Sequence, residues 1–445
     1  MNLLEALVNA LRLPELRNKI LFTAGMLVVL RVFAQVSIPG ANQQALTQLF
    51  SGSALLGLLN LFSGGGLQTF SVVAMGVNPY INAIIIMQLL GVVSERINEI
   101  NKEGEMGRQR ISRWTRWLTV GLALLQAYGY TVLFQNTNPA ILSPKMALGT
   151  RLLVMLTLTG GTVMMMWFGE LITEYGIGNG ISLVIFAGII GQGPGALIGA
   201  IQTHLAQGGG LTALTPLFGF AAIAFAVTMV IIEFQQAIRK VPIQSAQRIL
   251  RGTTVPARSS FMPLRVNQAG VIPIIFAISI MFFPTIVANY LAGFPPHSIE
   301  GQYSAWVRTY FIPNSPNMYA LIGYNCAYFL LTVLFTFFYT AVTFKPDEAA
   351  DNLKKASSFV PGIRPGVPTA EYLGRVMNRI TLAGGLFLGF ITVVLPLATA
   401  DLTGINSTQL YLGGTAILII VGVALDTMRQ LETQLVMRQY RGFIH

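Results

Sequence analysis

Ten apolar stretches, each about as long as a membrane-spanning helix, follow one another along the sequence. A helix needs about 20 mostly apolar residues to cross the hydrocarbon core of a bilayer. Of the 445 residues only 10% are charged, whereas a soluble globular chain carries roughly 25% charged residues. This composition excludes a soluble multidomain enzyme, a disordered chain and a coiled coil. We expect an all-α integral membrane protein with spans at 19–38, 69–93, 116–134, 150–171, 179–201, 212–236, 269–292, 318–344, 379–400 and 410–427.

The basic residues predict how the spans are oriented. Ten spans place both termini on one side, and 24 of the 28 Lys and Arg residues then fall in segments on that side. Because Lys and Arg are enriched in cytosolic segments, we expect both termini in the cytosol. Two halves of five spans, 1–201 and 202–445, would be inverted relative to each other, as in many transporters. We expect residues 1–13 to form a short amphipathic helix at the membrane interface.

The predicted membrane interior holds almost no ionisable side chain. Glu170, Glu233 and Asp426 fall near the cytosolic ends of their spans, and Arg31 lies toward the outer end of the first. Carriers coupled to protons or sodium usually keep such groups near mid-membrane, so this pattern disfavours them. No phosphate-binding P-loop is present, the single cysteine is Cys326, and the three histidines lie far apart. We expect no cofactor, no metal site and no enzymatic activity, with any energy supplied by a partner.

Two long segments on the predicted cytosolic side, 239–268 and 345–378, are rich in Arg, Lys and Pro. Orientation requires only a few charges near the span ends, and loops of this length are usually functional or disordered. A solvated loop is one reading. The other is a docking surface for an anionic partner such as ribosomal RNA.

The segment 55–68 is apolar but too short to span the membrane before its run of glycines. A re-entrant or interfacial piece is the reading that composition favours. A movable stopper hinged at Gly64, Gly65 and Gly66 is the alternative. Several spans, here the second and the seventh, carry isolated polar or helix-breaking residues, and buried polar groups in lipid need partners or water. These spans are therefore expected to face one another or a wet cavity; the residues are Asn78, Pro79, Asn82, Gln88 and Pro273.

Several strings of residues, in order along nearly the whole chain, resemble the SecY family of protein-conducting channels. They are NLFSGG (60–65), GVNPYINA (76–83), KEGEMGR (102–108), ITEYGIGNGIS (172–182), NQAGVIPIIFA (267–277), FKPDEAADNLKKASSFVPGIRPG (344–366) and VGVALD (421–426). The resemblance implies two inverted five-helix halves around an hourglass pore. It also implies a gated channel that passes unfolded secretory polypeptides and releases transmembrane segments sideways into lipid.

The resemblance also assigns the residues of the closed pore. The constricting ring would be Val77, Ile81, Ile185, Ile189, Ile275 and Ile419. A ring of aliphatic side chains can exclude water and ions. The plug, at about residues 54–66, would comprise Leu55, Leu56, Leu58, Leu59, Asn60, Leu61, Phe62, Ser63, Gly64 and Gly65. Gln88 would lie at a lateral gate, between spans two and three on one edge and seven and eight on the other.

By the same resemblance, the two basic loops would dock the ribosome and the SecA motor ATPase. The docking residues would be Arg248, Arg251, Lys354, Lys355 and Arg364. Pro361 and Pro365 stiffen the backbone around Arg364 because proline fixes φ. The expected partners are small SecE-like and SecG-like membrane subunits, SecA, the ribosome, signal-bearing polypeptides and membrane lipid. The expected location is the bacterial cytoplasmic (inner) membrane.

Two other functional classes compete with this reading. Without the resemblance, a channel and a secondary transporter for a small solute are about equally supported. The lack of mid-membrane charges and the two long docking loops argue against the transporter. An intramembrane protease or lipid transferase would need a buried nucleophile or acid–base pair, and the sequence offers none that can be pointed to. The resemblance decides for the channel.

Overall fold

The structure, a computed structural model, describes residues 13–52, 60, 63–135, 140–143, 146–206, 215–245, 248–250, 253–255, 259–291, 295, 297–311, 317–403 and 413–441. Within these residues, one long helix lies in each of the ten expected spans. They are α2 (Pro14–Gln35), α5 (Asn78–Val93), α7 (Glu105–Gln135), α8 (Leu148–Tyr175), α9 (Gly180–Ala206), α10 (Thr215–Gln236), α11 (Ile272–Leu291), α13 (Met318–Thr343), α15 (Val367–Thr403) and α16 (Gly414–Arg441).

The shorter elements lie between these helices. The helices are α3 (Gln43–Gly52), α6 (Glu95–Lys102), α12 (Ile299–Tyr310) and α14 (Pro346–Lys355). The strands are β1 (Ile238–Ser245), β2 (Arg248–Leu250), β3 (Thr253–Val255), β4 (Ser259–Arg265) and β5 (Ser358–Phe359). By length and composition, six of the described helices could cross a membrane, or seven if α5 and α6, bent by 101°, count as one span. The fold is therefore that of a multi-pass helical membrane protein.

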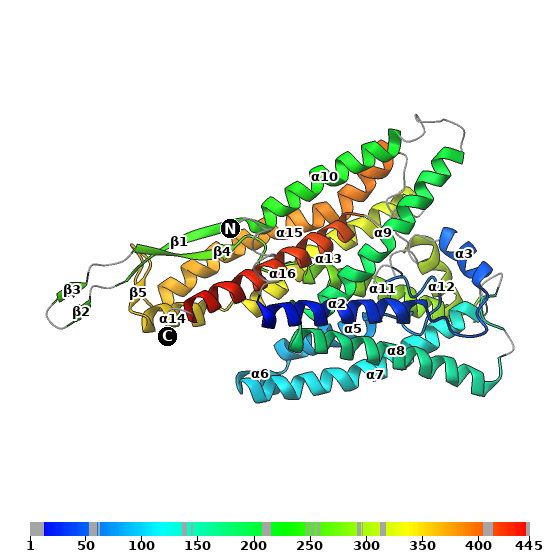
Figure 1. Cartoon of the computed structure of the whole chain (residues 1–445), viewed down its shortest axis with the longest axis horizontal. Helices are drawn as coiled ribbons and strands as arrows, with labels where there is room; N and C mark the ends of the chain where they lie inside the picture. Colours follow the sequence, from blue (N-terminus) through cyan, green and yellow to red (C-terminus); the bar gives the residue numbers. More distant parts are fainter. Residues whose placement is uncertain are drawn as a thin grey trace.

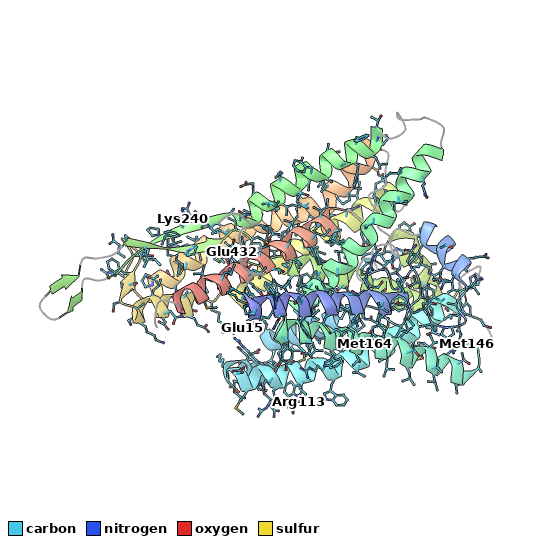
Figure 2. All side chains as sticks on the ribbon, viewed as in Figure 1. Glu15, Arg113, Met146, Met164, Lys240 and Glu432 are labelled. Atoms are coloured by element: carbon cyan, nitrogen blue, oxygen red, sulfur yellow. The ribbon has the colours of Figure 1, made fainter. Side chains whose placement is uncertain are left out.

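The helices form an elongated bundle with two different ends (Figure 1). The hairpin of β1 and β4 projects from one end, where α2 begins and α16 finishes; we call this the hairpin end. The short helices α3 and α12 lie at the opposite end, which we call the far end. Among the side chains labelled in Figure 2, Glu15, Lys240 and Glu432 lie toward the hairpin end and Met146 lies at the far end.

The second span starts later than the sequence predicted. A helix was expected over 69–93, but α5 begins only at Asn78, and residues 63–76 form a series of turns. Gly76 has φ +57°, which interrupts helical geometry, and Pro79 lies in the first turn of α5, where its missing N–H costs nothing. Ser71 pairs with Ser37 in an isolated bridge that ties these turns to the end of α2. The turns lead directly into Val77, the residue that precedes α5.

The two basic segments, expected as loops, form strands and a helix that join into one unit. Strand β1 pairs antiparallel with β4 and also with β5, so the sheet order is β4-β1-β5. A small core packs this sheet against α14 and the start of α15; its buried residues are Val241, Leu264, Val360, Leu373 and Met377. We call β1, β4, β5, α14 and the first turns of α15 the docking unit. It is a folded body, because strands from one segment close a sheet with a strand from the other.

The main hydrophobic core runs through the whole bundle. It contains buried residues of α2, α5, α7, α8 and α9 together with residues of α10, α11, α13, α15 and α16. The division of the chain at residues 201 and 202 stays a prediction. What the core does establish is that the predicted halves pack against each other through a common apolar interior.

Candidate functional site

The six aliphatic residues predicted to form the ring are all buried in the main core. They are Val77, Ile81, Ile185, Ile189, Ile275 and Ile419, with exposed fractions from 0% to 7%. They come from α5 and the residue before it, α9, α11 and α16. Helix α5 contacts α11, and α9 contacts α16. The structure therefore places residues far apart in sequence in one apolar cluster, as a ring requires.

A cavity of about 500 Å³ borders this cluster. Ile81, Ile185 and Ile275 line it, together with the polar residues Gln88 and Tyr339. A second cavity, of about 590 Å³, lies beside it and reaches Arg265 at the end of β4 and Asp426 of α16. The two cavities share four lining residues: Asn179, Ser182, Ile272 and Tyr339. A recess lined by polar and apolar side chains thus leads from the hairpin end to the apolar cluster.

The edges of the predicted lateral gate meet at this recess. Helices α5 and α7 both contact α11, and α11 packs on α13. Gln88 of α5 lines the cavity, and its Oε1 is buried with no hydrogen-bond partner among the described residues. A buried amide oxygen without a partner costs free energy, so this position favours a movable seam over a permanent contact. The gate role of Gln88 stays a prediction.

The described part of the predicted plug lies on the other side of the ring. Gly64 has φ +68°, and a Cβ at Gly64 would come within 3.3 Å of the Gly188 Cα, beside Ile189 of the ring. Glycine allows both this backbone conformation and this close approach. Along α9, Ser182 lines the recess, Ile185 and Ile189 belong to the ring, and Gln192 follows about one turn later. The recess, the predicted ring and the described part of the predicted plug therefore follow one another along a single helix.

Asn60 joins the predicted plug to α9 through its buried side chain, which is 0% exposed. The Asn60 Nδ2 donates to Gln192 Oε1 at 3.0 Å and to Gln68 Oε1 at 3.3 Å. Gln192 Nε2 donates in return to the Asn60 carbonyl at 3.2 Å, and the Gln68 backbone N–H donates to Asn60 Oδ1 at 2.9 Å. Every polar atom of the Asn60 side chain is thus paired in this state.

Arg31 of α2 makes a second attachment. Its Nη1 donates to the carbonyl of Gly64 at 2.6 Å. The guanidinium lies against Gly191 of α9, where a Cβ would overlap it. We call Arg31, Asn60, Gly64 and Gln192 the latch. Sequence reasoning located Asn60 and Gly64 but assigned nothing to Gln192, because no local pattern predicts a contact across 132 residues.

Part of the predicted plug and docking set lies outside the described residues. This holds for the helix expected at 1–13, of which residue 13 alone is described, and for Arg251. It also holds for Leu55, Leu56, Leu58, Leu59, Leu61 and Phe62.

The described docking residues lie on the docking unit or on the hairpin beyond it. Lys354 and Lys355 are exposed in the last turn of α14. Arg364 is exposed in a turn between Gly362 (φ +81°) and Gly366 (φ +100°), and its carbonyl accepts a 2.8 Å hydrogen bond from Thr369 Oγ1. Arg248 begins β2, toward the tip of the hairpin. Positive side chains therefore project from a folded surface at the hairpin end.

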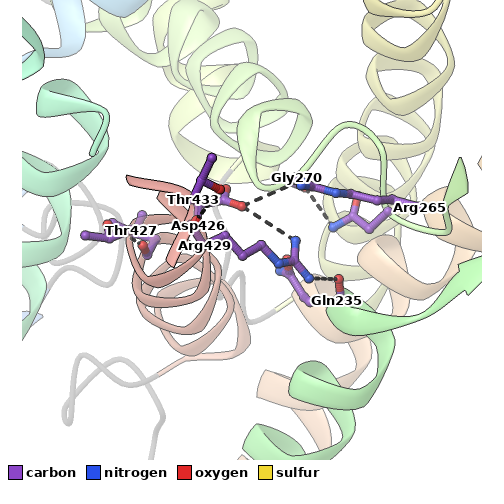
Figure 3. A network of polar contacts seen from close by, with 9 residues as sticks. Gln235, Arg265, Gly270, Asp426, Thr427, Arg429 and Thr433 are labelled. Carbon is purple, nitrogen blue, oxygen red and sulfur yellow. Dashed lines mark hydrogen bonds and ion pairs between the residues drawn. The ribbon is translucent and has the colours of Figure 1, made fainter. Parts of the chain in front are cut away.

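A polar network joins the base of the hairpin to α16 (Figure 3). Asp426 of α16 lies 4.0 Å from Arg265 of β4 and 3.9 Å from Arg429, measured between charged atoms. Arg429 Nη2 also donates to the carbonyl of Gln235, the next-to-last residue of α10, at 3.0 Å. Ile419 precedes Asp426 by seven residues, or about two turns, so both share a face of α16. The network therefore connects the docking unit to a helix that carries a ring residue.

The described residues contain no group of three or more His, Cys, Asp or Glu that could hold a metal ion. The site combines a recess with polar side chains in its lining, a buried aliphatic cluster, and a turn region joined to α9 by hydrogen bonds. These features define a gated membrane channel.

Comparisons with known proteins agree with that class. The SecY family profile matches residues 71–428. The protein translocase subunit SecY of Streptomyces griseus is 41% identical over 99% of both chains, and that of Mycobacterium bovis is 40% identical over 99% of this chain and 100% of its own. The chain belongs to the SecY family.

Solved structures show the same fold. A structure described as a protein conducting channel has a TM-score of 0.64 at 18% identity, covering 94% of this chain and 93% of its own. A SecY structure in which the plug domain is said to stabilise the closed state has a TM-score of 0.66, also at 18% identity, over 94% of this chain and 92% of its own. Sec61 in the canine ribosome–channel complex has a TM-score of 0.61 at 17% identity, covering 94% of this chain and 93% of its own.

Proposed function

We propose that this chain forms the pore through which unfolded secretory polypeptides cross the membrane, and that the pore is closed in the structure. The observation that carries the proposal is the double closure along α9, where Ile185 and Ile189 of the dry ring are followed by Gln192 of the latch. Aliphatic side chains block ions yet make no directional bonds, so the ring can yield to many peptide sequences. A small-solute site would instead need fixed polar groups at the constriction.

We also propose that transmembrane segments leave sideways through the seam of α5 and α7 against α11 and α13. The unpaired Oε1 of Gln88 at this seam supports the proposal, since separating the helices there breaks no hydrogen bond to that atom. A signal sequence that binds only the separated state would shift the closed–open equilibrium by its differential affinity.

The energy for transport would come from outside the chain. The basic docking unit at the hairpin end would bind the SecA ATPase or the translating ribosome; a structure with the same fold is Sec61 in the canine ribosome–channel complex. SecE-like and SecG-like subunits complete the proposed assembly. The hairpin end would face the cytosol of a bacterial inner membrane, with both termini on that side, because Lys and Arg gather there.

Site-specific photo-crosslinking tests the pathway. A photo-crosslinker replaces Ile275 in the ring, and a matched control replaces Phe283, which is on the same helix but 63% exposed. A stalled, signal-bearing chain is then presented with SecA or the ribosome. Cross-links to the mature part of that chain at residue 275, with none at residue 283, are expected. If residue 275 forms no cross-link while a probe at Arg364 cross-links to the partner, the ring assignment is wrong but the docking proposal still holds. Absence of cross-links at both residue 275 and residue 364, with an active partner, would contradict the whole proposal.

A further inference from the structure

Helix α12 lies outside the ten spanning helices, yet it carries a row of large, mainly apolar side chains that are exposed. Ile299, Tyr303, Trp306 and Tyr310 are 84%, 36%, 55% and 43% exposed. Their spacing of i, i+4, i+7 and i+11 puts them on one face of the helix. We call this face the α12 stripe. The rings of Trp306 and Tyr310 lie 6.0 Å apart, so the aromatic residues form a connected surface.

The orientation of the α12 stripe is fixed by the opposite side of the helix. Gly301, Ser304 and Val307 are buried where α12 packs against α11. Ser304 Oγ donates a 2.7 Å hydrogen bond to the carbonyl of Ala288 in α11. The helix also starts at a capped position, since Ser298 Oγ accepts from the Gly301 N–H at 3.1 Å. Because α12 is held to α11 by this buried face, the exposure of the stripe does not come from a free rotation of the helix.

The surroundings of the α12 stripe identify what it faces. Helix α12 contacts both α11 and α13, at the far-end terminus of each. At that terminus α13 begins with Met318, Tyr319 and Ile322, which are 67%, 87% and 55% exposed. The α12 stripe therefore continues the exposed apolar surface of a spanning helix at the level where that helix enters the bilayer.

The residue types match the boundary between lipid and water. Trp and Tyr are enriched there because their rings are apolar while the indole N–H and phenol O–H reach polar headgroups. The stripe itself carries no charge, and α12 contains one acidic residue, Glu300, and one basic residue, Arg308. A helix of this kind lies in the interface plane with its apolar face turned into the lipid.

We propose that the α12 stripe is a lipid-binding surface that seats α12 in the membrane interface at the far end of the bundle. The partner is phospholipid at the level of the glycerol and upper acyl chains. This inference does not depend on polypeptide transport, so it stands or falls separately from the proposed function.

Fluorescence quenching by brominated lipid tests the proposal. The sequence has four Trp residues, so Trp114→Phe, Trp117→Phe and Trp167→Phe together leave Trp306 as the sole reporter. The full chain, with any Trp of bound small subunits also replaced by Phe, is reconstituted in phosphatidylcholine vesicles brominated either near the headgroup or deep in the acyl chain. Shallow bromine should quench Trp306 emission several-fold more strongly than deep bromine. Aqueous acrylamide should quench it only weakly.

Two variants and three outcomes make the test decisive. Tyr303→Ser combined with Tyr310→Ser should weaken shallow quenching and strengthen quenching by acrylamide, whereas Ala305→Ser, on another exposed face of α12, should change neither. Strong acrylamide quenching in the parent would mean that the stripe faces water. Absence of quenching by all three agents would mean that a protein subunit covers it. Equal quenching by shallow and deep bromine would mean that the helix does not lie at the interface. Each of these three results overturns the proposal.

Discussion

The predicted ring and the latch would close the same passage by opposite physical means. The ring consists of six aliphatic side chains, all buried, whose contacts are non-directional. The latch is polar, and its hydrogen bonds join Arg31, Asn60, Gly64 and Gln192 across three separate parts of the chain. The two seals lie within about two turns of each other along α9.

This difference suggests a division of labour. The stabilisation that apolar contacts provide falls gradually as the side chains move apart. A ring can therefore deform around a passing chain and close again. Hydrogen bonds need defined distances and angles, so a latch is either made or broken. The comparison predicts that latch variants change how often the passage opens, whereas ring variants change how well it seals.

The largest effect is expected from Arg31→Met, which removes the charged donor to the Gly64 carbonyl. Hydrogen bonds to charged groups contribute about 1.5–3 kcal/mol, which corresponds to roughly a tenfold to hundredfold increase in the open population. Ion leak through vesicles that contain the resting channel measures this increase. Arg17→Met is the control, because Arg17 is an exposed residue of the same helix. Wild-type leak in Arg31→Met would show that the guanidinium does not hold the plug.

The second-largest effect is expected when the two hydrogen-bond partners of the Asn60 side chain, Gln192 and Gln68, are removed one at a time. Gln192→Ala removes two hydrogen bonds that join Asn60 to α9, whereas Gln68→Ala removes one that stays within the plug region. At about 1 kcal/mol for each neutral bond, Gln192→Ala should raise the leak roughly tenfold to thirtyfold. Gln68→Ala should raise it much less. Similar leak in both variants would mean that the plug is held by its own turns and not by α9.

The latch also marks where prediction from sequence ends. Hydropathy located the ten helices, and family motifs predicted six ring residues, which the structure buries within one core cluster. The attachment of Asn60 to Gln192 depends on how α9 packs beside the plug, and no local pattern contains that information. The start of α5 was placed too early because residues 69–77 are as apolar as a span, and Gly76 (φ +57°) ends that continuity. The sheet that joins the two basic segments was not predicted, because β1 and β5 are separated in sequence by two membrane spans.

A smaller effect is expected from the ring. Ile185→Val removes one methylene, and such changes in buried positions cost about 0.5–1.5 kcal/mol. With the latch intact, leak should rise only slightly, because the plug still blocks the passage. Combined with Gln192→Ala, the same change should raise leak by more than the product of the two single effects, since neighbouring sites do not behave independently. Strict multiplicativity in this double-variant cycle would show that ring and latch act as independent barriers.

The smallest effect is expected where the docking unit meets α16. Asp426→Asn removes the charge that faces Arg265 and Arg429, at 4.0 and 3.9 Å. The Asp426 side chain is 56% exposed, so solvent screening limits each pair to under about 1 kcal/mol. Hydrogen–deuterium exchange of β4 should therefore quicken by less than about fivefold. Glu371→Gln on α15, an equal charge change at an exposed residue of the docking unit, should leave β4 exchange unchanged. High salt should reduce the difference between Asp426→Asn and the parent, because it screens the pairs in the parent alone. A difference that salt does not reduce would mean that hydrogen bonding and packing, and not charge, hold the hairpin to the helix that carries Ile419.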